Sequence, residues 1–247
     1  MAEYKRPSCL ADSPSGYCPG CMHSLATRLI ADAIEELGQQ DNSLNIISVG
    51  CSALNILYWG GDYLACAHGR APAAATGAKR VNPERLVFTY QGDGDLAAIG
   101  LAEIVSAANR GENFTVIFAN NQTYGMTGGQ MAPTTLIGQK TTTSVYGRDP
   151  ATAGYPIKMC ELLSTLEAPH FVARYALNSP KGVTDARKAI KRAFENQLDG
   201  KGFTFIELLT NCPTNWKLSP VDTLEYMNTN TMQYFKPGVY RDKEAGI

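Results

Sequence analysis

The sequence lacks the features that mark three broad classes of protein. No run of about 18 apolar residues occurs, so no membrane-spanning helix is expected. The N-terminal residues MAEYKRPSC are polar and contain no apolar core of a secretory signal. The formal net charge is −1, so there is no basic excess with which to hold nucleic-acid phosphates. We therefore expect a cytoplasmic protein that binds neither membranes nor nucleic acids.

Cysteine is present, but not in the even number that a disulfide framework needs. The seven cysteines stand at positions 9, 18, 21, 51, 66, 160 and 212. In the reducing compartment expected for this chain, free thiols are the rule. Cys18 and Cys21 form a C-x-x-C pair, which in such a compartment is typical of metal or redox chemistry.

The distribution of apolar residues predicts alternating strands and helices. Continuous apolar runs predict strands buried on both faces, and apolar spacings of three and four predict helices. Strands are expected at 45–49, 86–90, 114–119, 171–176 and 203–209. Helices are expected at 24–37, 73–79, 96–108, 158–166, 181–197 and 221–227. This order indicates a doubly wound α/β fold with a mostly parallel sheet and helices on both faces.

The sequence is compatible with one domain and two terminal extensions. The domain is expected to span 1–247, with an N-terminal arm at about 1–23 and a C-terminal tail at about 213–247. Residues 122–150 are rich in glycine and threonine and show no clear periodicity. A loop of this length inside a compact domain is often functional.

Two short polar motifs follow neighbouring strands of the predicted sheet. Gly92-Asp93-Gly94 ends one strand and Asn120-Asn121 ends the next, with 25 residues between the motifs. A crossover helix would bring these ends side by side, so a carboxylate and an amide would meet where Mg²⁺ and a phosphate can bind. The glycines admit a diphosphate to the backbone, and the helix that opens at Leu96 points its N-terminus the same way. Each motif alone is also typical of an ordinary turn.

Four of the cysteines are candidates for one metal site. Cys51 and Cys212 follow predicted strands and can approach Cys18 and Cys21. Four thiolates suit either zinc or an iron–sulfur cluster, and their wide spacing does not choose between them. A purely structural role of the C-x-x-C pair also stays open. Of the other cysteines, one competes as a ligand and two are expected to be buried small apolar side chains: Cys9, and Cys66 with Cys160.

Longer motifs make the sequence similar to one enzyme family. GDG followed by NN resembles the thiamine diphosphate fingerprint of thiamine-dependent enzymes. The further motifs are YCPGC, VGCS at 49–52, AHGRAPAAATGAKR at 67–80, TYQGDGDLAAIGLAEI at 89–104, NNQTYGMTGGQMAPTT at 120–135 and NCPTNW at 211–216. Together, over about residues 16–220, they resemble the β subunit of 2-oxoacid:ferredoxin oxidoreductases. Within this family the resemblance is greatest to the 3-methyl-2-oxobutanoate and 2-oxoglutarate branches.

The resemblance implies a thiamine diphosphate-binding domain and its site residues. Mg²⁺ would be held by Asp93, Asn121 and the backbone carbonyl of Thr123. One 4Fe-4S cluster would be held by Cys18, Cys21, Cys51 and Cys212. Thiamine diphosphate would be lined by Val49, Gly50, Cys51, Ser52, His68, Gly92, Gly94, Asp95, Gly125, Met126 and Thr127. The candidate catalytic residues are His68 and Cys51.

Three other residues near these motifs are given structural roles. Met22 stands where the family commonly has glycine, which adds bulk near the cluster but removes no ligand. His23 is at the family's histidine position and is expected to cap or pack at the start of a helix. His170, next to a strand start, is expected to be structural.

The resemblance also implies an activity and partners. The family oxidatively decarboxylates a 2-oxoacid to an acyl-CoA, and its electrons pass to ferredoxin or to a further iron–sulfur subunit. The sequence has no C-x-x-C-x-x-C-x-x-x-C run, so such an acceptor is expected to be a separate protein. The glutamate that activates thiamine diphosphate resides on a pyrimidine-binding domain in this superfamily. An α subunit is therefore expected to supply it, together with much of the substrate site.

The sequence favours a branched-chain or aromatic 2-oxoacid as the substrate. Segment 50–59, GCSALNILYW, carries no cation for a second carboxylate. Its apolar residues would form either a substrate wall or ordinary core: Leu54, Ile56, Leu57 and Trp59. For 2-oxoglutarate, which stays the alternative, Arg70 or a partner residue would have to bind the dicarboxylate.

Two rival functions account for only part of the pattern. A non-redox thiamine-dependent decarboxylase subunit would share the GDG and NN motifs but leave four cysteines unexplained. A zinc-stabilised interaction module would use the cysteines but give the GDG and NN motifs no role.

Overall fold

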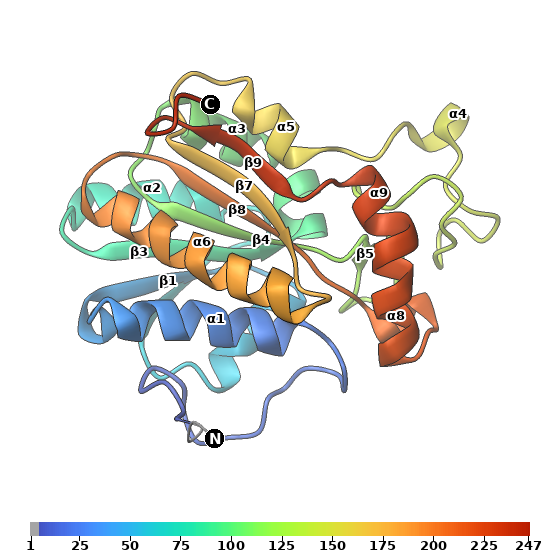
Figure 1. Ribbon diagram of the computed structural model, residues 1–247, viewed down its shortest axis with the longest axis horizontal. Helices are drawn as coiled ribbons and strands as arrows, with labels where there is room; N and C mark the ends of the chain where they lie inside the picture. The colour runs from blue at the N-terminus through green and yellow to red at the C-terminus, as the bar shows by residue number, and fades with distance from the viewer. Residues whose placement is uncertain (1–4) are drawn as a thin grey trace.

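A seven-stranded sheet forms the centre of the protein. The computed structural model describes residues 5–247, so the first four residues of the predicted arm lie outside the described part. The strand order is β2-β1-β3-β4-β8-β7-β9, and neighbouring strands are parallel except for β9, which is antiparallel to β7 (Figure 1). The strands are β1 (Ser43–Ile47), β2 (Asp62–Ala65), β3 (Leu86–Gly92), β4 (Thr115–Asn120), β7 (Phe171–Ala176), β8 (Thr204–Leu209) and β9 (Gly238–Asp242). The predicted mostly parallel α/β fold is confirmed.

The central strands are buried on both faces, as their continuous apolar runs predict. Every residue of β4 and β8 is buried. Successive side chains of a strand point to opposite faces of the sheet, so Ile117 and Phe118 of β4 enter two different apolar clusters. Both faces therefore need a covering layer of helices.

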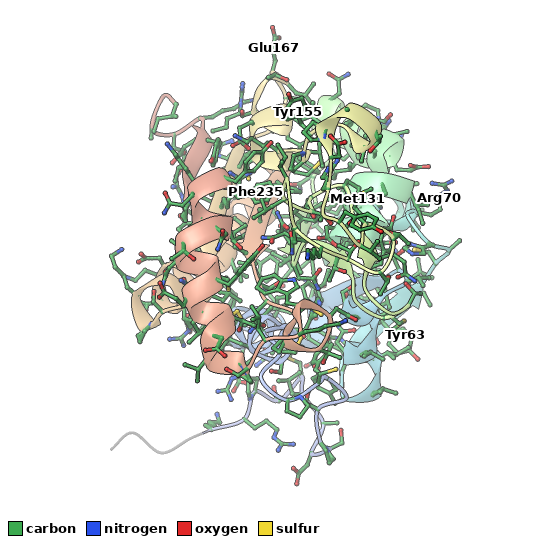
Figure 2. All side chains as sticks on the ribbon, turned by 90° about the vertical axis from the view of Figure 1, so that its right-hand side faces the viewer. Tyr63, Arg70, Met131, Tyr155, Glu167 and Phe235 are labelled. Carbon is green, nitrogen blue, oxygen red and sulfur yellow. The ribbon has the colours of Figure 1, made fainter. Side chains whose placement is uncertain are left out.

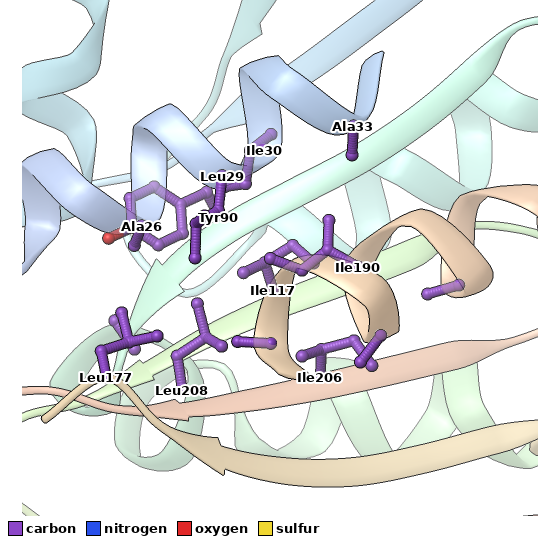
Figure 3. Close-up of a cluster of buried hydrophobic side chains, with 14 of the residues drawn as sticks. Ala26, Leu29, Ile30, Ala33, Tyr90, Ile117, Leu177, Ile190, Ile206 and Leu208 are labelled. Carbon is purple, nitrogen blue, oxygen red and sulfur yellow. The ribbon is translucent and has the colours of Figure 1, made fainter. Parts of the chain in front are cut away.

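One face is covered by α1 (His23–Glu36) and α6 (Pro180–Leu198), which lie side by side on the sheet (Figure 1). Figure 3 shows Ile30 of α1 and Ile190 of α6 with Ile117 and Ile206 of the sheet in one buried cluster. The chain leaves α1 through Gly38, whose φ of +64° suits the glycine that commonly follows a helix.

The opposite face is covered by α2 (Ala71–Val81), α3 (Leu101–Asn109) and α5 (Met159–Ser164). Their residues Ala75, Ile104 and Leu163 are fully buried in the second apolar cluster. The predicted helix at 96–108 begins irregularly, because a π-helical turn at Asp95–Ile99 precedes α3. Turns of this kind occur frequently at functional sites.

Strands β2 and β9 are absent from the prediction because neither has a continuous apolar run. All four residues of β2 are exposed at the edge of the sheet. β9 lies at the end of the predicted tail and pairs with β7 through an irregularity at Val172 and Ala173. The rest of this tail forms α7 (Pro213–Trp216), α8 (Pro220–Tyr226), a π-helical turn at Met227–Thr231 and α9 (Met232–Tyr234).

The long segment at 122–150 starts beside the carboxyl ends of the strands. β5 (Thr123–Tyr124) and β6 (Gln130–Met131) form a short antiparallel ladder. The chain then extends to α4 (Pro150–Ala153) on an arm that projects from the sheet (Figure 1). The Arg148 guanidinium donates to backbone carbonyls within 132–135 and 153–155 and so joins the two ends of this arm. Within residues 5–247, no helix has both the length and the apolar character needed to cross a membrane.

Candidate active site and cysteine cluster

The carboxyl ends of β1, β3 and β4 surround a cavity of about 100 Å³. Parallel pairing of β3 with β4 sets Gly92 opposite Ala119, so Asp93 and Asn121 follow neighbouring strand ends. The cavity is lined by His23, Val49, Gly50, Cys51, Ser52, His68, Gly92, Asp93, Gly94, Asp95, Asn121, Thr123, Tyr124, Gly125, Met126 and Thr127. The fold thus brings together every residue predicted to bind thiamine diphosphate or Mg²⁺, and it adds His23 and Tyr124.

Asp93 is a buried carboxylate whose hydrogen bonds come from neutral groups. The Thr134 hydroxyl donates to Oδ2 at 2.5 Å, and the Gly94 N–H donates to Oδ1 at 2.9 Å. Burial raises the pKa of Asp93 to about 6. Because a buried negative charge needs compensation, this carboxylate favours a cation beside it. Oxygen donors of this type, together with the Asn121 amide, fit Mg²⁺.

Two glycines of the predicted diphosphate loop have different roles. A Cβ on Gly94 would lie 2.2 Å from Cε1 of Tyr124, whose hydroxyl donates to the Gly94 carbonyl at 3.2 Å. A Cβ on Gly92 would meet no heavy atom within 4 Å. The ring of Tyr124 therefore requires a glycine at position 94, whereas Gly92 leaves open space beside the backbone for a ligand. Sequence reasoning missed Tyr124 and Thr134, although both lie within the motif at 120–135.

His68 contacts the buried carboxylate of Asp95 through its Nδ1 atom. Asp95 also accepts hydrogen bonds from the Ser48 hydroxyl, the Gly69 N–H and the Gln91 side chain. Ser48 and Gln91 are polar partners that sequence reasoning missed: Ser48 lies 47 residues from Asp95, within a strand predicted as apolar, and Gln91 directly follows the predicted strand at 86–90.

A second cavity, of about 60 Å³, adjoins the first and collects the four candidate cluster ligands. It is lined by Tyr17, Cys18, Cys21, His23, Cys51, Leu54, Asn121, Gly125, Cys212, Pro213, Thr214 and Asn215. Within residues 5–247, no group of three or more His, Cys, Asp or Glu side chains is arranged to hold a single metal ion. A 4Fe-4S cluster makes a different demand, because each cysteine binds a separate iron, and a sulfur-rich donor set fits it.

Burial favours the neutral form of three thiols in this second cavity, those of Cys21, Cys51 and Cys212. It raises the pKa of Cys21 to about 11 and that of Cys51 to about 12, and it raises the pKa of Cys212 as well. The Asn215 amide lies 3.2 Å from the Cys212 Sγ and also donates to the Gly125 carbonyl. A cluster would therefore have to displace protons from these thiols when it binds.

The remaining cysteines lie outside the second cavity. Cys9 is buried with its Sγ 3.8 Å from the Ala31 carbonyl, and Cys160 is buried among apolar side chains. Cys66 is partly exposed, so its predicted burial holds only in part. His170 is buried at the start of β7, outside both cavities, as expected for a structural residue.

The apolar segment at 50–59 divides between three environments. Leu54 lines the cysteine cavity, whereas Leu57 is exposed. Trp59 is buried against Phe88 and belongs to the core. Arg70 lines neither cavity: it pairs with Glu103 and projects outward at the edge of the molecule (Figure 2).

Comparisons with known proteins identify relatives that contain a thiamine pyrophosphate-binding domain or belong to 2-oxoacid oxidoreductases. The family model for the thiamine pyrophosphate enzyme C-terminal TPP-binding domain matches residues 48–208. The ketoisovalerate oxidoreductase subunit VorA of Methanothermobacter thermautotrophicus is 47% identical over 242 residues, 98% of this chain and 51% of VorA. The 2-oxoglutarate synthase subunit KorB of Archaeoglobus fulgidus is 34% identical over 229 residues, 93% of this chain and 80% of KorB. The chain thus spans about half the length of VorA.

A solved structure shows the same architecture. The 2-oxoglutarate:ferredoxin oxidoreductase from Magnetococcus marinus, with 2-oxoglutarate, coenzyme A and succinyl-CoA bound, matches 92% of this chain and 74% of its own. The TM-score is 0.77 and the sequence identity is 26%. The resemblance drawn from the sequence motifs is therefore confirmed. The chain belongs to the family of thiamine pyrophosphate-binding β subunits of 2-oxoacid:ferredoxin oxidoreductases.

Proposed function

We propose that this chain is the thiamine diphosphate- and 4Fe-4S-carrying subunit of an enzyme that oxidatively decarboxylates a 2-oxoacid to an acyl-CoA. The observation that carries the proposal is the position of Cys51, which lines both the Asp93 cavity and the four-cysteine cavity. When bound, thiamine diphosphate supplies the electron sink for loss of CO₂ from the 2-oxoacid. A cluster ligated by Cys51 would lie at the wall of the same cavity and give the electrons an exit. A non-redox decarboxylase would not need an iron–sulfur cluster at the wall of its cofactor cavity.

Different residues of this chain would bind Mg²⁺, the cluster and thiamine diphosphate. Asp93, Asn121 and the Thr123 carbonyl would bind the Mg²⁺ that bridges to the diphosphate, beside the open backbone at Gly92. The cluster would be held by Cys18, Cys21, Cys51 and Cys212. Val49, Ser52, His68, Gly125, Met126 and Thr127 would line the rest of the cofactor.

A partner subunit would complete the site. The cavity of about 100 Å³ is smaller than the roughly 300–1,000 Å³ of typical ligand pockets, so this chain supplies only part of the walls. Val49 and Met126 of its lining are 39% and 46% exposed, an apolar surface suited to being covered. No glutamate is among the lining residues within 5–247. We propose that an α subunit brings the activating glutamate and covers this surface, and that coenzyme A and ferredoxin, or a ferredoxin-like subunit, act as co-substrate and electron acceptor.

We propose a branched-chain or aromatic 2-oxoacid as the substrate. Neither cavity is lined by a lysine or arginine within residues 5–247, and Arg70 is engaged with Glu103 away from both. A second carboxylate would lack a partner on this chain. VorA, at 47% identity, is named for ketoisovalerate, whereas KorB is named for 2-oxoglutarate. 2-Oxoglutarate is the alternative if the α subunit supplies the cation.

The first test is the metal and cofactor content of enzyme purified without oxygen together with its partner subunit. We expect about four iron and four sulfide per chain, broad visible absorption, and Mg²⁺-dependent binding of thiamine diphosphate. Zinc in place of iron, with no affinity for thiamine diphosphate, would support an interaction module instead. Thiamine diphosphate binding without iron would support a non-redox decarboxylase.

The second test is the substrate. The ratio of kcat/KM for 3-methyl-2-oxobutanoate to that for 2-oxoglutarate should exceed about 100, since an unpaired buried carboxylate costs several kcal/mol. A ratio below one would identify 2-oxoglutarate as the substrate. It would also direct the search for a cation to the α subunit.

A further inference from the structure

We propose that Asp95 is a positioning residue that acts through His68. By accepting the Nδ1–H of His68, it holds the imidazole with Nε2 toward the cavity, where this nitrogen contacts the bound 2-oxoacid. This inference rests on the proposed function and deepens it.

Both oxygens of the Asp95 carboxylate accept hydrogen bonds from this chain. Its Oδ1 accepts from the Ser48 hydroxyl at 2.8 Å, from the Gly69 N–H at 2.6 Å and from Nδ1 of His68. Its Oδ2 accepts from Gln91 Nε2 at 2.6 Å. A carboxylate has about four lone-pair sites, and the Asp95 side chain is 1% exposed. Three of these donors share Oδ1 and one reaches Oδ2, so both oxygens are held by groups of this chain.

The contact with Asp95 distinguishes the two His68 nitrogens. With the Asp95 carboxylate as the acceptor, Nδ1 carries the hydrogen of this contact. Within residues 5–247, Nε2 has no hydrogen-bond partner, and the side chain is 32% exposed in the wall of the cavity. A carboxylate behind Nδ1 fixes the tautomer and the orientation of the ring, as in catalytic triads. Nε2 is thus the atom that faces the ligand.

The backbone holds the two side chains in a fixed relation. Asp95 opens the π-helical turn that ends at Ile99, and Gly69 directly follows His68. Gly69 has φ +77°, and a Cβ there would lie 2.6 Å from Ile99 Cγ2 and 2.7 Å from the Gly100 nitrogen. A Cβ on Gly100 would in turn lie 2.6 Å from the Gly69 carbonyl oxygen. Close contact of these two backbones leaves His68 and Asp95 no room to separate.

The direct test is the tautomer of His68 by ¹⁵N-histidine NMR on the complex with the partner subunit, in which only this chain is labelled, with thiamine diphosphate and Mg²⁺. The chain has three histidines, so His68→Asn assigns its signal by difference. We expect a hydrogen on Nδ1 in the wild-type protein, and a change in the Nε2 signal when a 2-oxoacid is added. A neutral ring with its hydrogen on Nε2 would overturn the proposal, and this measurement needs no variant of Asp95 to fold.

The variants Asp95→Asn and Ser48→Ala separate positioning from cofactor binding. Asp95→Asn should lower kcat at least about tenfold and remove the Nδ1–H signal, while the Kd for thiamine diphosphate stays within about threefold. Ser48→Ala removes one donor to the same oxygen but keeps the charge, so His68 should retain its Nδ1–H. If Asp95→Asn instead weakens thiamine diphosphate binding as much as it lowers kcat, the partner of His68 is a diphosphate oxygen and the proposal is wrong.

Failure of this inference is distinguishable from failure of the proposed function. Wild-type enzyme that neither binds thiamine diphosphate nor decarboxylates a 2-oxoacid would remove the proposed function. Wild-type enzyme that does both, with His68 carrying its only hydrogen on Nε2, would remove this inference alone.

Discussion

Two buried carboxylates, Asp93 and Glu207, are compensated in different ways. Glu207 of β8 lies 2.9 Å from Nη2 of Arg174 and accepts a hydrogen bond from Asn120 at 2.8 Å. Asp93, after β3, is buried to a similar degree, but its bonds come from the hydroxyl of Thr134 and from backbone N–H. The first charge is balanced by the chain itself. The second is not balanced by any lysine or arginine within residues 5–247.

This difference is the one expected if Glu207 is a structural charge and Asp93 binds a ligand. A buried ion pair requires only that both partners be present. A buried carboxylate with neutral donors is costly in the free protein and favourable once a cation binds. The unbalanced acid also lies in the cavity that collects the thiamine motif, whereas the balanced one lies toward β7 and β9. The contrast therefore identifies the ligand-binding end of the sheet without reference to any relative.

The largest effect is expected where the site has no substitute ligand. Cys212→Ser should remove the cluster, so iron falls from about four atoms per chain and turnover with an electron acceptor is lost. Cys160→Ala, a buried cysteine outside both cavities, should keep its iron. Iron content unchanged in Cys212→Ser would make Cys9 or Cys66 the fourth-ligand candidate.

The balanced charge should matter for folding and not for cofactor binding. Arg174→Met leaves Glu207 buried without its partner and should lower the free energy of unfolding by about 3–5 kcal/mol, measured by urea denaturation. The double variant Arg174→Met with Glu207→Gln should recover much of this loss. Equal instability of the single and double variants would show that the ion pair is not the cause.

The unbalanced charge of Asp93 should matter for cofactor binding and should not stabilise the fold. Asp93→Asn should weaken Mg²⁺-dependent thiamine diphosphate binding at least about 100-fold, more than loss of an outer-shell group does. It should also raise the free energy of unfolding of the cofactor-free protein by about 1 kcal/mol, because a costly buried charge is gone. Titration calorimetry and urea denaturation measure the two effects. Unchanged affinity would count against the Mg²⁺ assignment, and Asp199→Asn, an exposed acid outside the cavity, is the control.

The smallest effect is expected at a partly exposed pair. Burial acts to raise the pKa of Asp242, but the bonds and charge of Arg192, together with two backbone N–H donors, outweigh it and hold this pKa below its usual value. A lowered pKa gives stability at neutral pH that is lost as the pH falls below about 4. Since Arg192 is partly exposed, the loss should be about 1 kcal/mol or less. Urea midpoints at pH 7 and pH 3 should differ less in Arg192→Gln than in the wild-type protein; an equal difference would contradict the assignment.

The sequence predicts the parallel core strands and their helices because a strand buried on both faces has a continuous apolar run. β7 is predicted with the bounds that the structure has. β2 and β9 escape such a prediction because edge strands pair through the backbone and need no apolar run. The π-helical turn at Asp95–Ile99, which precedes α3, could not be predicted either, because such a turn changes the hydrogen bonding of the backbone and not the composition of the sequence.

For the site, the sequence predicts which residues meet but not how each is bonded. The two polar motifs end neighbouring parallel strands, so chain order alone places Asp93 beside Asn121. Thr134 and Tyr124 come from the aperiodic segment, whose path is set by contacts and not by periodicity. The family resemblance supplied the cysteine set, because a spacing from residue 18 to residue 212 carries little signal by itself.

The sequence by itself determined the donor chemistry of this protein and its position at the carboxyl ends of the strands. The physical reason is that strand order and the crossover connection bring strand ends to one edge whatever the side chains do there. Only the tertiary structure decided which buried charge has a partner, which cysteine joins the two cavities, and which carboxylate orients His68. Those outcomes depend on distances between residues far apart in the chain, and periodicity and spacing contain no measure of such distances.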